Sequence, residues 1–293
     1  MEIISVVMTT YNGEKYILEQ LNSVLNQTVI PNQLIIADDC SKDKTKEIVN
    51  EYIKFVDSNI DIVFFSNSIN QGYIKNFRKA ILKATGDYIF LCDQDDIWER
   101  NKIEITINEM RKRKKDVACT GFRLVDAQGQ EIINTNIYRS DPVSGYEKWS
   151  NKVYEVTLSR LIWGNFSPGC TYCFSHNVME IYKKLTNVEI SHDFQIILIG
   201  ACLDSAIFID KPLSSYRLHS SNTIGMNGKE KKRKRYFVPR LIRFLNELNK
   251  YCPVKISVWE RGILYVRLPK IRWVFIRRFN LNNYLKLKYT AGK

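Results

Sequence analysis

The sequence predicts an α/β protein with a mostly parallel central sheet flanked by helices, followed by a basic helical C-terminal extension. In the first hundred residues, short apolar runs rich in β-branched residues alternate with stretches of helical spacing, as is typical of strands joined by crossover helices. Residues 226–293 hold 19 Lys and Arg against 3 Asp and Glu, whereas residues 1–225 hold 25 against 28. The net charge of +13 therefore belongs to the end of the chain, and we expect a domain over 1–225 and an extension over 226–293.

The elements of the first half follow one another in a regular order. Each predicted strand is a short apolar run that ends in a polar loop, and each predicted helix has apolar residues three or four positions apart. Ser41 is the expected N-cap of the second helix. The predicted elements are strands at 3–8, 33–37, 61–65 and 88–92, and helices at 14–26, 43–55 and 73–84.

The second half has a less regular pattern. Short strands are expected on either side of Gly121 and around Pro212. The extension is expected to begin with a basic linker at 226–235 and then to mix aromatic and aliphatic residues with Arg and Lys. The predicted elements are strands at 117–120, 122–125, 206–209 and 213–216, helices at 151–162 and 193–203, and a loop at 168–174 that enters a strand.

Polar side chains follow three of the four predicted strands of the first half. Tyr11-Asn12, Asp38-Asp39 and the stretch Asp93-Gln94-Asp95-Asp96 each begin where an apolar run ends. The carboxyl ends of parallel strands meet at one edge of a sheet, and ligands of such sheets bind there. We therefore expect these residues to form one site.

The stretch at 93–96 carries three carboxylates in four residues, which repel one another. A hard divalent cation such as Mg²⁺ or Mn²⁺ compensates this repulsion, since it prefers oxygen ligands from a few carboxylates, water and phosphate. The alternative is a solvated acidic turn. The fully apolar strand before it and Ile97-Trp98 after it favour the metal site.

Further candidates are weaker when taken alone. A carboxylate at 38–39 can accept a nucleobase N–H or ribose hydroxyls, or it can cap a helix. Asn70-Gln71-Gly72 is explained by a turn, and Lys75 after it can reach a phosphate or lie on a solvated face. Asp193 is either a general base or a first-turn helix residue. Arg217 and His219 can serve a phosphate and a metal, or they can be structural.

Several classes of protein are excluded or disfavoured. The chain contains no GxxxxGK[ST], GxGxxG or HExxH motif, which argues against a P-loop NTPase, a dinucleotide oxidoreductase and a zincin. The CxxC at 170–173 has no second pair, so no zinc site is expected. The seven cysteines indicate a reducing compartment, and neither a signal peptide nor an apolar run of about 20 residues is present, so we expect a cytoplasmic protein.

Taken together, these motifs resemble the family 2 inverting glycosyltransferases of the GT-A fold. The order and spacing match over about 100 residues, and the later segments at 192–193 and 209–219 resemble the rhamnosyltransferase-like branch, which builds bacterial surface polysaccharides. In many relatives Glu precedes the base Asp, whereas this chain has His192. The first segments that carry the resemblance are 5–13, 37–45, 70–72, 85–88 and 93–96.

The resemblance implies a nucleotide-binding part at 1–115 and an acceptor part at 116–225, with a role for each matched residue. Asp193 would be the catalytic base, and Asp95 and His219 would bind the metal, Mn²⁺ or Mg²⁺. The residues expected to bind the donor are Thr9, Tyr11, Asn12, Asp39, Asn70, Gly72, Lys75, Asp93 and Arg217. The residues expected to bind the acceptor are Trp98, Gly169, Cys170, Thr171 and His192.

The implied reaction is a single inverting displacement by an acceptor hydroxyl on a nucleoside-diphosphate sugar. The branch favours dTDP-rhamnose, a UDP-sugar stays open, and the acceptor would be a saccharide or a lipid-linked saccharide. The basic tail, with interleaved aromatic residues, is typical of an anionic membrane surface, so we expect a location on the inner face of the membrane and no nucleic acid partner. The alternatives are a sugar-nucleotide nucleotidyltransferase and a non-enzymatic nucleotide- or nucleic-acid-binding protein.

Overall fold

The computed structural model describes residues 2–57, 59–132, 150–161, 165, 167–187, 189–219 and 230–252, with backbone alone over 230–238. The chain divides into two compact units, residues 1–226 and residues 227–293.

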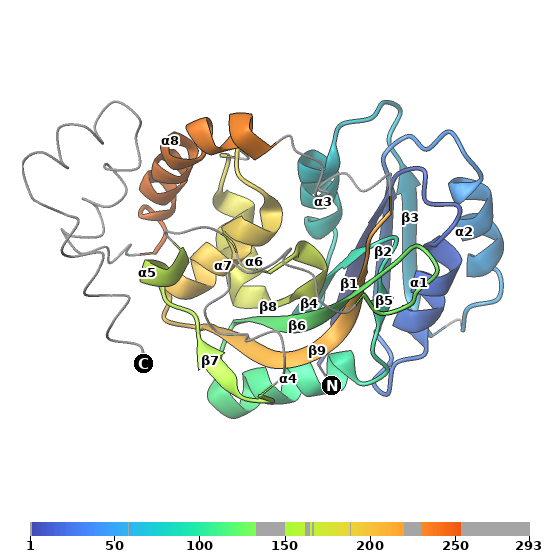
Figure 1. The fold of residues 1–293 in the computed structure, drawn as a ribbon, viewed down its shortest axis with the longest axis horizontal. Coiled ribbons are helices and arrows are strands. Elements are labelled where there is room, and N and C mark those ends of the chain that lie inside the picture. The colour runs from blue at the N-terminus through green and yellow to red at the C-terminus, as the bar shows by residue number, and fades with distance from the viewer. Residues whose placement is uncertain are drawn as a thin grey trace, which may run out of the picture. The chain divides into compact units, whose positions relative to one another are not determined.

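Figure 1 shows the strands and helices of the described residues. The strands are β1 Ile4–Thr10, β2 Gln33–Asp38, β3 Asp61–Ser66, β4 Tyr88–Asp93, β5 Ile97–Trp98, β6 Val117–Val125, β7 Val153–Glu155, β8 Tyr172–Ser175 and β9 Ala206–Arg217. The helices are α1 Ile17–Leu25, α2 Thr45–Ile53, α3 Tyr73–Ile81, α4 Lys102–Arg113, α5 Leu158–Leu161, α6 His176–Lys184, α7 His192–Cys202 and α8 Glu230–Leu248, with a 3₁₀ turn at Gly169–Thr171.

The described strands form one sheet in the order β3-β2-β1-β4-β8-β6-β9-β5, with β7 paired to β9. Strands β1 to β4 are parallel, which confirms the arrangement predicted for the first half. Strand β8 runs antiparallel to both β4 and β6, whereas β6 and β9 are parallel. The sheet is therefore mixed rather than mostly parallel, because β8 enters it between β4 and β6.

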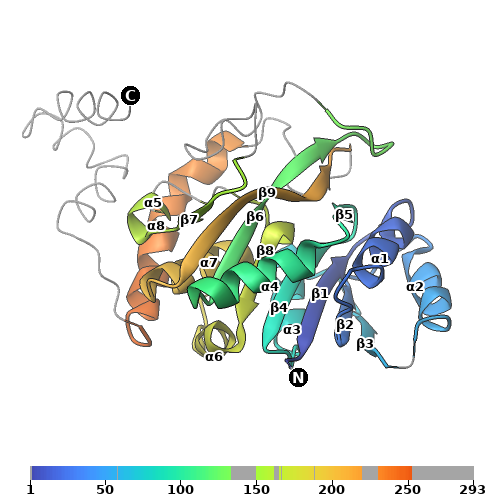
Figure 2. The same ribbon diagram turned by 90° about the horizontal axis from the view of Figure 1, so that it is seen from below.

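Helices cover both faces of the sheet (Figures 1 and 2). Alternate residues of a strand point to opposite faces, so Val6 and Met8 of β1 enter one core cluster together with apolar residues of α1, α2 and α4. Val7, between them, is also fully buried but lies outside this cluster, and α3 packs against β1 and β2. This double cover explains why β1 and β2 are buried along their whole length and read as continuous apolar runs.

Four expectations about local structure are wrong. The strands expected at 117–120 and 122–125 are one strand, β6. Residues 151–162 are not one helix, because β7 pairs with β9 before the short α5 begins. The two strands around Pro212 are one strand, β9, whose register against β6 shifts near Gly121, so the irregularity is a bulge and not a break. Ser41 does not cap α2: Lys44 holds the N-cap position, and the Ser41 hydroxyl donates to Asp38 instead.

The second unit contains helix α8, which starts inside the segment expected to be a basic linker and includes Pro239. Its helical form agrees with the predicted helical extension. Residues 253–293 lie outside the described residues. Among the residues that the structure describes, no helix is long and apolar enough to cross a membrane.

Candidate active site

The tips of β1, β2 and β4 lie side by side at the carboxyl edge of the parallel strands. Thr9 of β1 pairs with Asp93 of β4, and Thr10 pairs with Asp38 of β2. The polar residues that follow these strands therefore leave the sheet at one edge, as the sequence predicts.

Gln94 joins the acidic stretch to the loop after β1. Its side-chain oxygen accepts the backbone N–H of Tyr11 at 2.8 Å, and its side-chain nitrogen donates to the Tyr11 carbonyl at 2.9 Å. A Cβ at Gly13 would lie 2.1 Å from the Gln94 side-chain oxygen, so the glycine leaves room for this clamp. The clamp holds the backbone of Tyr11, a residue that is 44% exposed and can meet a ligand.

Asp39 organises the loop that precedes α3. Its Oδ1 accepts the Asn67 side-chain amide at 3.0 Å and the Gln71 backbone N–H at 2.8 Å, and its Oδ2 accepts the Gly72 N–H at 2.8 Å. Gly72 has φ +81°, a backbone conformation that glycine adopts without strain. From the sequence, Asp39 and the turn at 70–72 are separate candidates. In the structure, the Asp39 carboxylate shapes this turn.

A second set of hydrogen bonds joins the loops after β1 and β2. Asn12, at φ +49°, accepts the Lys42 N–H on its side-chain oxygen at 2.8 Å, and its own N–H donates to the Ser41 hydroxyl at 2.9 Å. The Gly13 N–H donates to the Thr45 hydroxyl at 2.7 Å. These bonds fix the two loops to each other before any ligand binds.

The carboxylates at 93–96 lie in a poorly solvated environment. Burial raises the pKa of Asp93 well above its ordinary value, and neighbouring carboxylates, with Asp96 first, raise it further. Burial and Asp95 raise the pKa of Asp96 to about 7. The fully buried ammonium of Lys102, which donates to the Cys170 carbonyl at 2.6 Å, opposes both shifts. One lysine does not offset this accumulation of negative charge, so the site favours an additional cation.

Two groups suit such a cation. The Asp95 Oδ2 and the His219 Nε2 lie 2.8 Å apart, although they come from residues 124 positions apart in sequence. A carboxylate with an imidazole is a donor set that Mn²⁺ accepts readily, and Mg²⁺ accepts the carboxylate. A second group, Asp93, Asp96 and Cys170, has ligand atoms within 4.8 Å of one another, but burial raises the pKa of the Cys170 thiol, so its thiolate form is disfavoured. The first pair fits a hard cation better.

Arg217, expected to bind the donor, is engaged by protein groups in this structure. Its side chain is 2% exposed, its Nε donates to the Asp95 carbonyl at 2.8 Å, and its Nη2 pairs with Glu19 at 2.6 Å. The backbone N–H of the same residue donates to Asp96 Oδ1 at 3.2 Å. The guanidinium is thus committed to protein groups, and its function is to hold the acidic loop against α1.

Asp193 lies in the first turn of α7, with Ser191 at the N-cap position, so it is not the cap. Its Oδ2 accepts the side-chain amide of Asn165 at 2.7 Å, and its buried Oδ1 has no hydrogen-bond partner among the residues that the structure describes. Its charge contributes to the raised pKa of Asp93, which places the two carboxylates in one electrostatic environment.

Most of the residues expected to contact the acceptor turn their side chains inward. Cys170 and Thr171 are fully buried, and Trp98 is 3% exposed with Lys102 over its ring. His192 stacks on Phe77 with ring centroids 3.8 Å apart. We therefore assign these four to the packing beneath the site. Gly169 is partly exposed, and a Cβ there would meet His192 Nε2 at 3.2 Å.

The remaining donor candidates surround the same edge. Thr9 is 8% exposed at the tip of β1, and Asn70 and Lys75 are exposed on the loop and helix that follow β3. Arg78, on the same helix as Lys75, instead donates to carbonyls at the end of α6. Arg217 and four of the acceptor candidates thus have buried side chains in this structure, and the polar residues that follow β1, β2 and β4 lie around the strand tips.

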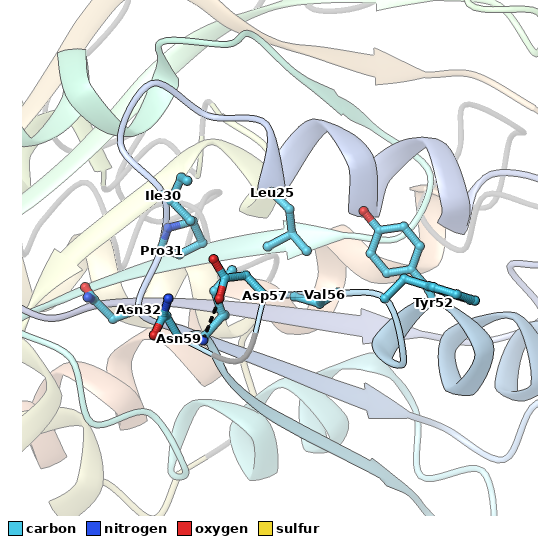
Figure 3. A pocket seen from close by; sticks show the side chains of 10 residues that line it. Leu25, Ile30, Pro31, Asn32, Tyr52, Val56, Asp57 and Asn59 are labelled. Atoms are coloured by element: carbon cyan, nitrogen blue, oxygen red, sulfur yellow. Dashed lines mark hydrogen bonds between the residues drawn. The ribbon is translucent and has the colours of Figure 1, made fainter.

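A hollow of the described surface lies away from the carboxyl edge. That hollow, of about 480 Å³, is lined by Leu25, Ile30, Pro31, Asn32, Tyr52 and residues 55–57, 59 and 60 (Figure 3). Several of these residues immediately precede β2 and β3, so the hollow lies at the amino ends of the strands. It carries none of the candidate catalytic groups.

Four residues of the site are not found from the sequence: Glu19, Lys102, Asn165 and Tyr172. Lys102 has a local signal, because it stands on the face of a helical pattern otherwise occupied by Ile103, Thr106 and Ile107. Glu19 and Asn165 act through partners distant in sequence, Arg217 at 198 residues and Asp193 at 28, whereas Tyr172 bonds to Asn165 seven residues before it. No periodicity or spacing identifies such a pair.

Comparison with known proteins identifies the family of the chain. A family model described as "Glycosyl transferase family 2" matches residues 5–182. The dTDP-rhamnosyl transferase RfbG of Shigella flexneri is 30% identical over 235 residues, which cover 75% of this chain and 74% of that protein. The UDP-Glc:alpha-D-GlcNAc-diphosphoundecaprenol beta-1,3-glucosyltransferase WfgD of Escherichia coli is 29% identical over 239 residues, which cover 79% of this chain and 83% of that protein.

A solved structure supports the fold. The crystal structure of S. aureus TarS 1–349 in complex with UDP-GlcNAc aligns with a TM-score of 0.62 at 19% identity and covers 99% of this chain and 92% of that chain. The likeness, together with the family match, confirms the predicted GT-A fold.

Proposed function

The chain belongs to glycosyl transferase family 2, and from this membership we propose that it is an inverting, metal-dependent enzyme that moves a sugar from a nucleoside diphosphate to a saccharide acceptor. The observation that carries the proposal is the position of Asp193. Its carboxylate has one oxygen fixed by Asn165 and the other without a partner among the described residues, and it lies near enough to Asp93 to influence its pKa. A base beside the acidic stretch is the arrangement that single-displacement transfer requires.

The donor is proposed to bind at the carboxyl edge of the parallel strands. The loop shaped by Asp39 and the exposed Tyr11 ring would meet the nucleoside, with Thr9, Asn12, Asn70, Gly72 and Lys75 around them. Asp95 and His219 would hold Mn²⁺ or Mg²⁺, which when bound supplies positive charge for the leaving diphosphate. Arg217 keeps Asp95 in place through its carbonyl.

Asp193 is proposed to take the proton of the acceptor hydroxyl. The acceptor oxygen then forms a bond to the anomeric carbon as the bond from that carbon to the diphosphate oxygen breaks, on the opposite face of the sugar. The anomeric configuration inverts, and no covalent sugar–enzyme intermediate forms. Asp193 is 9% exposed, so a bound acceptor would leave little room for competing water.

The sugar we favour is rhamnose, donated by dTDP-rhamnose. The support is the similarity to a dTDP-rhamnosyl transferase over three quarters of the chain. The second relative takes its sugar from UDP-Glc, and the structural neighbour binds UDP-GlcNAc, so a UDP-sugar is the competing donor.

The acceptor we favour is a lipid-linked saccharide used in bacterial surface polysaccharide synthesis. The support is the diphosphoundecaprenol-linked acceptor in the name of the second relative. The basic extension, +16 over residues 226–293, suits an anionic membrane surface, so we propose a peripheral position on the inner face of the membrane. Flotation of the full chain with anionic but not with zwitterionic vesicles tests this location.

The proposed reaction is tested by turnover of dTDP-rhamnose and UDP-glucose, each with Mn²⁺ and with a synthetic GlcNAc-diphosphate lipid. We expect Asp193→Asn to bind the donor as the unchanged chain does and to lose transfer by about a hundredfold or more, as when a general base is removed. NMR of the product reports the inverted anomeric centre. Transfer that persists in Asp193→Asn removes this residue from the base role, and a retained configuration rejects the inverting mechanism.

A further inference from the structure

We propose that Asn165 and Tyr172 are positioning residues that orient Asp193 for proton transfer, an inference that rests on the proposed function. Asp193 lies on α7, Tyr172 begins β8, and Asn165 belongs to the connection that precedes the 3₁₀ turn. Two hydrogen bonds link the three side chains in a row, with Asn165 in the middle.

The direction of these bonds is set by chemistry. The phenol of Tyr172 donates to the Asn165 side-chain oxygen at 2.6 Å, so the amide nitrogen of Asn165 faces the other way and donates to Asp193 Oδ2 at 2.7 Å. Reversal of the amide would turn its oxygen toward a carboxylate oxygen of Asp193. Both oxygens are acceptors, so no hydrogen bond would form between them. The acceptor-only carboxylate of Asp193 therefore fixes the amide orientation, and the Tyr172 hydroxyl and the Ser167 N–H donate to the oxygen on the other side and hold it.

The two carboxylate oxygens of Asp193 are thereby distinguished. Oδ2 is occupied by the amide, whereas Oδ1 has no partner among the described residues. A buried carboxylate oxygen without a donor is costly, and a hydroxyl of a bound acceptor would supply that donor. The arrangement directs the basic lone pair of Asp193 to one atom, Oδ1.

Asn165 is supported by a buried side chain of the central sheet. Tyr172 is fully buried, and burial raises the pKa of its phenol well above the ordinary value, so the hydroxyl keeps its proton as a donor. Ser167 anchors the connection, since its hydroxyl lies 2.7 Å from that of Thr171 and 3.3 Å from the Thr120 carbonyl in β6. The row of side chains is thus fixed to the central sheet.

The neighbouring titratable group does not take this role. His192 precedes Asp193, but its two ring nitrogens have no partner among the described residues, and its ring stacks on Phe77. Burial lowers the pKa of His192 to about 4, so the ring is neutral at neutral pH. Asn165 is the side chain that holds the carboxylate, and its support is a phenol rather than a charged group.

The test compares Asn165→Ala and Tyr172→Phe in the full chain, with Tyr182→Phe as a matched control. Tyr182 is also a buried tyrosine, close enough to Asp193 for that carboxylate to raise its pKa, but it lies outside this row of hydrogen bonds. We expect kcat to fall about tenfold to a hundredfold in Asn165→Ala and several-fold in Tyr172→Phe, the sizes for a lost bond to a charged group and to a neutral one. The donor KM should be unchanged in both, and Tyr182→Phe should keep the original kcat.

A second readout separates positioning from mere loss of stability. Removal of a donor to an ionised carboxylate favours its protonated form, so the acidic limb of the kcat profile should move to higher pH in Asn165→Ala and Tyr172→Phe. Unchanged kcat and an unchanged limb in a folded Tyr172→Phe overturn the inference, while loss of transfer in Asp193→Asn still supports the proposed function. Transfer that persists in Asp193→Asn instead means that the proposed base role has failed.

Discussion

His219 Nε2 lies 2.8 Å from Asp95 Oδ2, so an imidazole from the end of the domain meets a carboxylate from the loop after the fourth parallel strand. The ring of His219 also rests against Tyr16, with centroids 4.8 Å apart. These contacts fix both side chains in a position from which one cation can be shared. Substitution of either side chain of this pair should therefore have the clearest effect on metal binding.

We expect Asp95→Ala to lose the part of donor affinity that depends on Mn²⁺, because it removes the carboxylate of this pair. His219→Ala should reduce the Mn²⁺-dependent part of donor affinity less, since Asp95 remains. Calorimetric titration of dTDP and UDP, with and without Mn²⁺, measures both effects. Equal affinity of Asp95→Ala and the unchanged chain in the presence of Mn²⁺ contradicts a metal role for Asp95.

Gly13 and Gln94 should behave as one unit. A Cβ at Gly13 would lie 2.1 Å from the end of the Gln94 side chain, which is flexible and can move away, so Gly13→Ala should break the clamp on Tyr11 without unfolding the domain. We expect donor KM to rise several-fold in Gly13→Ala and in Gln94→Ala, with kcat little changed. The double variant should resemble either single one, because both remove the same contact. Additive effects in steady-state kinetics would show that the two residues act separately.

The first half of the fold can be predicted from the sequence because its information is local. The apolar runs at 3–8 and 33–37 correspond to β1 and β2, and the polar residues after them lie at one edge, as expected. Helix α4 and strand β5 are not predicted. Lys102 and Glu104 begin α4 with charged residues, and a two-residue strand is defined only by its partner β9.

The site is less predictable from the sequence than the fold, because the use of each residue depends on contacts made only in the folded chain. Residue type identifies Asp95 and Asp193 as candidates, since few side chains bind a hard cation or remove a proton. The use of Arg217 for packing depends on Glu19 and on carbonyls that only the folded chain brings near. Burial likewise removes Cys170 and Thr171 from the surface, and burial is a property of the assembled layers.

Arg217 should matter for stability more than for donor contact. We expect Arg217→Ala to lower the free energy of unfolding by about 3 kcal/mol, because it leaves the carbonyls of Asp95 and Ala127 without their guanidinium donor. Glu19→Gln should cost about 1 kcal/mol or less, since Glu19 is half exposed and its pairing is screened by water. Urea denaturation measures both changes. Equal losses in the two variants would show that the ion pair, rather than the bonds to the acidic loop, is the stabilising feature.

His192 should make the domain sensitive to acid. Burial lowers its pKa to about 4 from the ordinary 6.5, and the nearby charge of Asp193 opposes this shift only in part. Below pH 6.5 the unfolded chain binds a proton at this residue that the folded chain does not, so its contribution to stability is complete above pH 6.5 and is lost as the pH falls toward 4. The difference corresponds to roughly 3 kcal/mol at most.

We expect His192→Phe, which can keep the stacking on Phe77, to flatten the stability profile between pH 6.5 and 4, whereas the exposed control His176→Gln should leave it unchanged. Urea midpoints measured across this range decide the matter: a slope that is the same in His192→Phe and in the unchanged chain would assign the acid sensitivity to other groups.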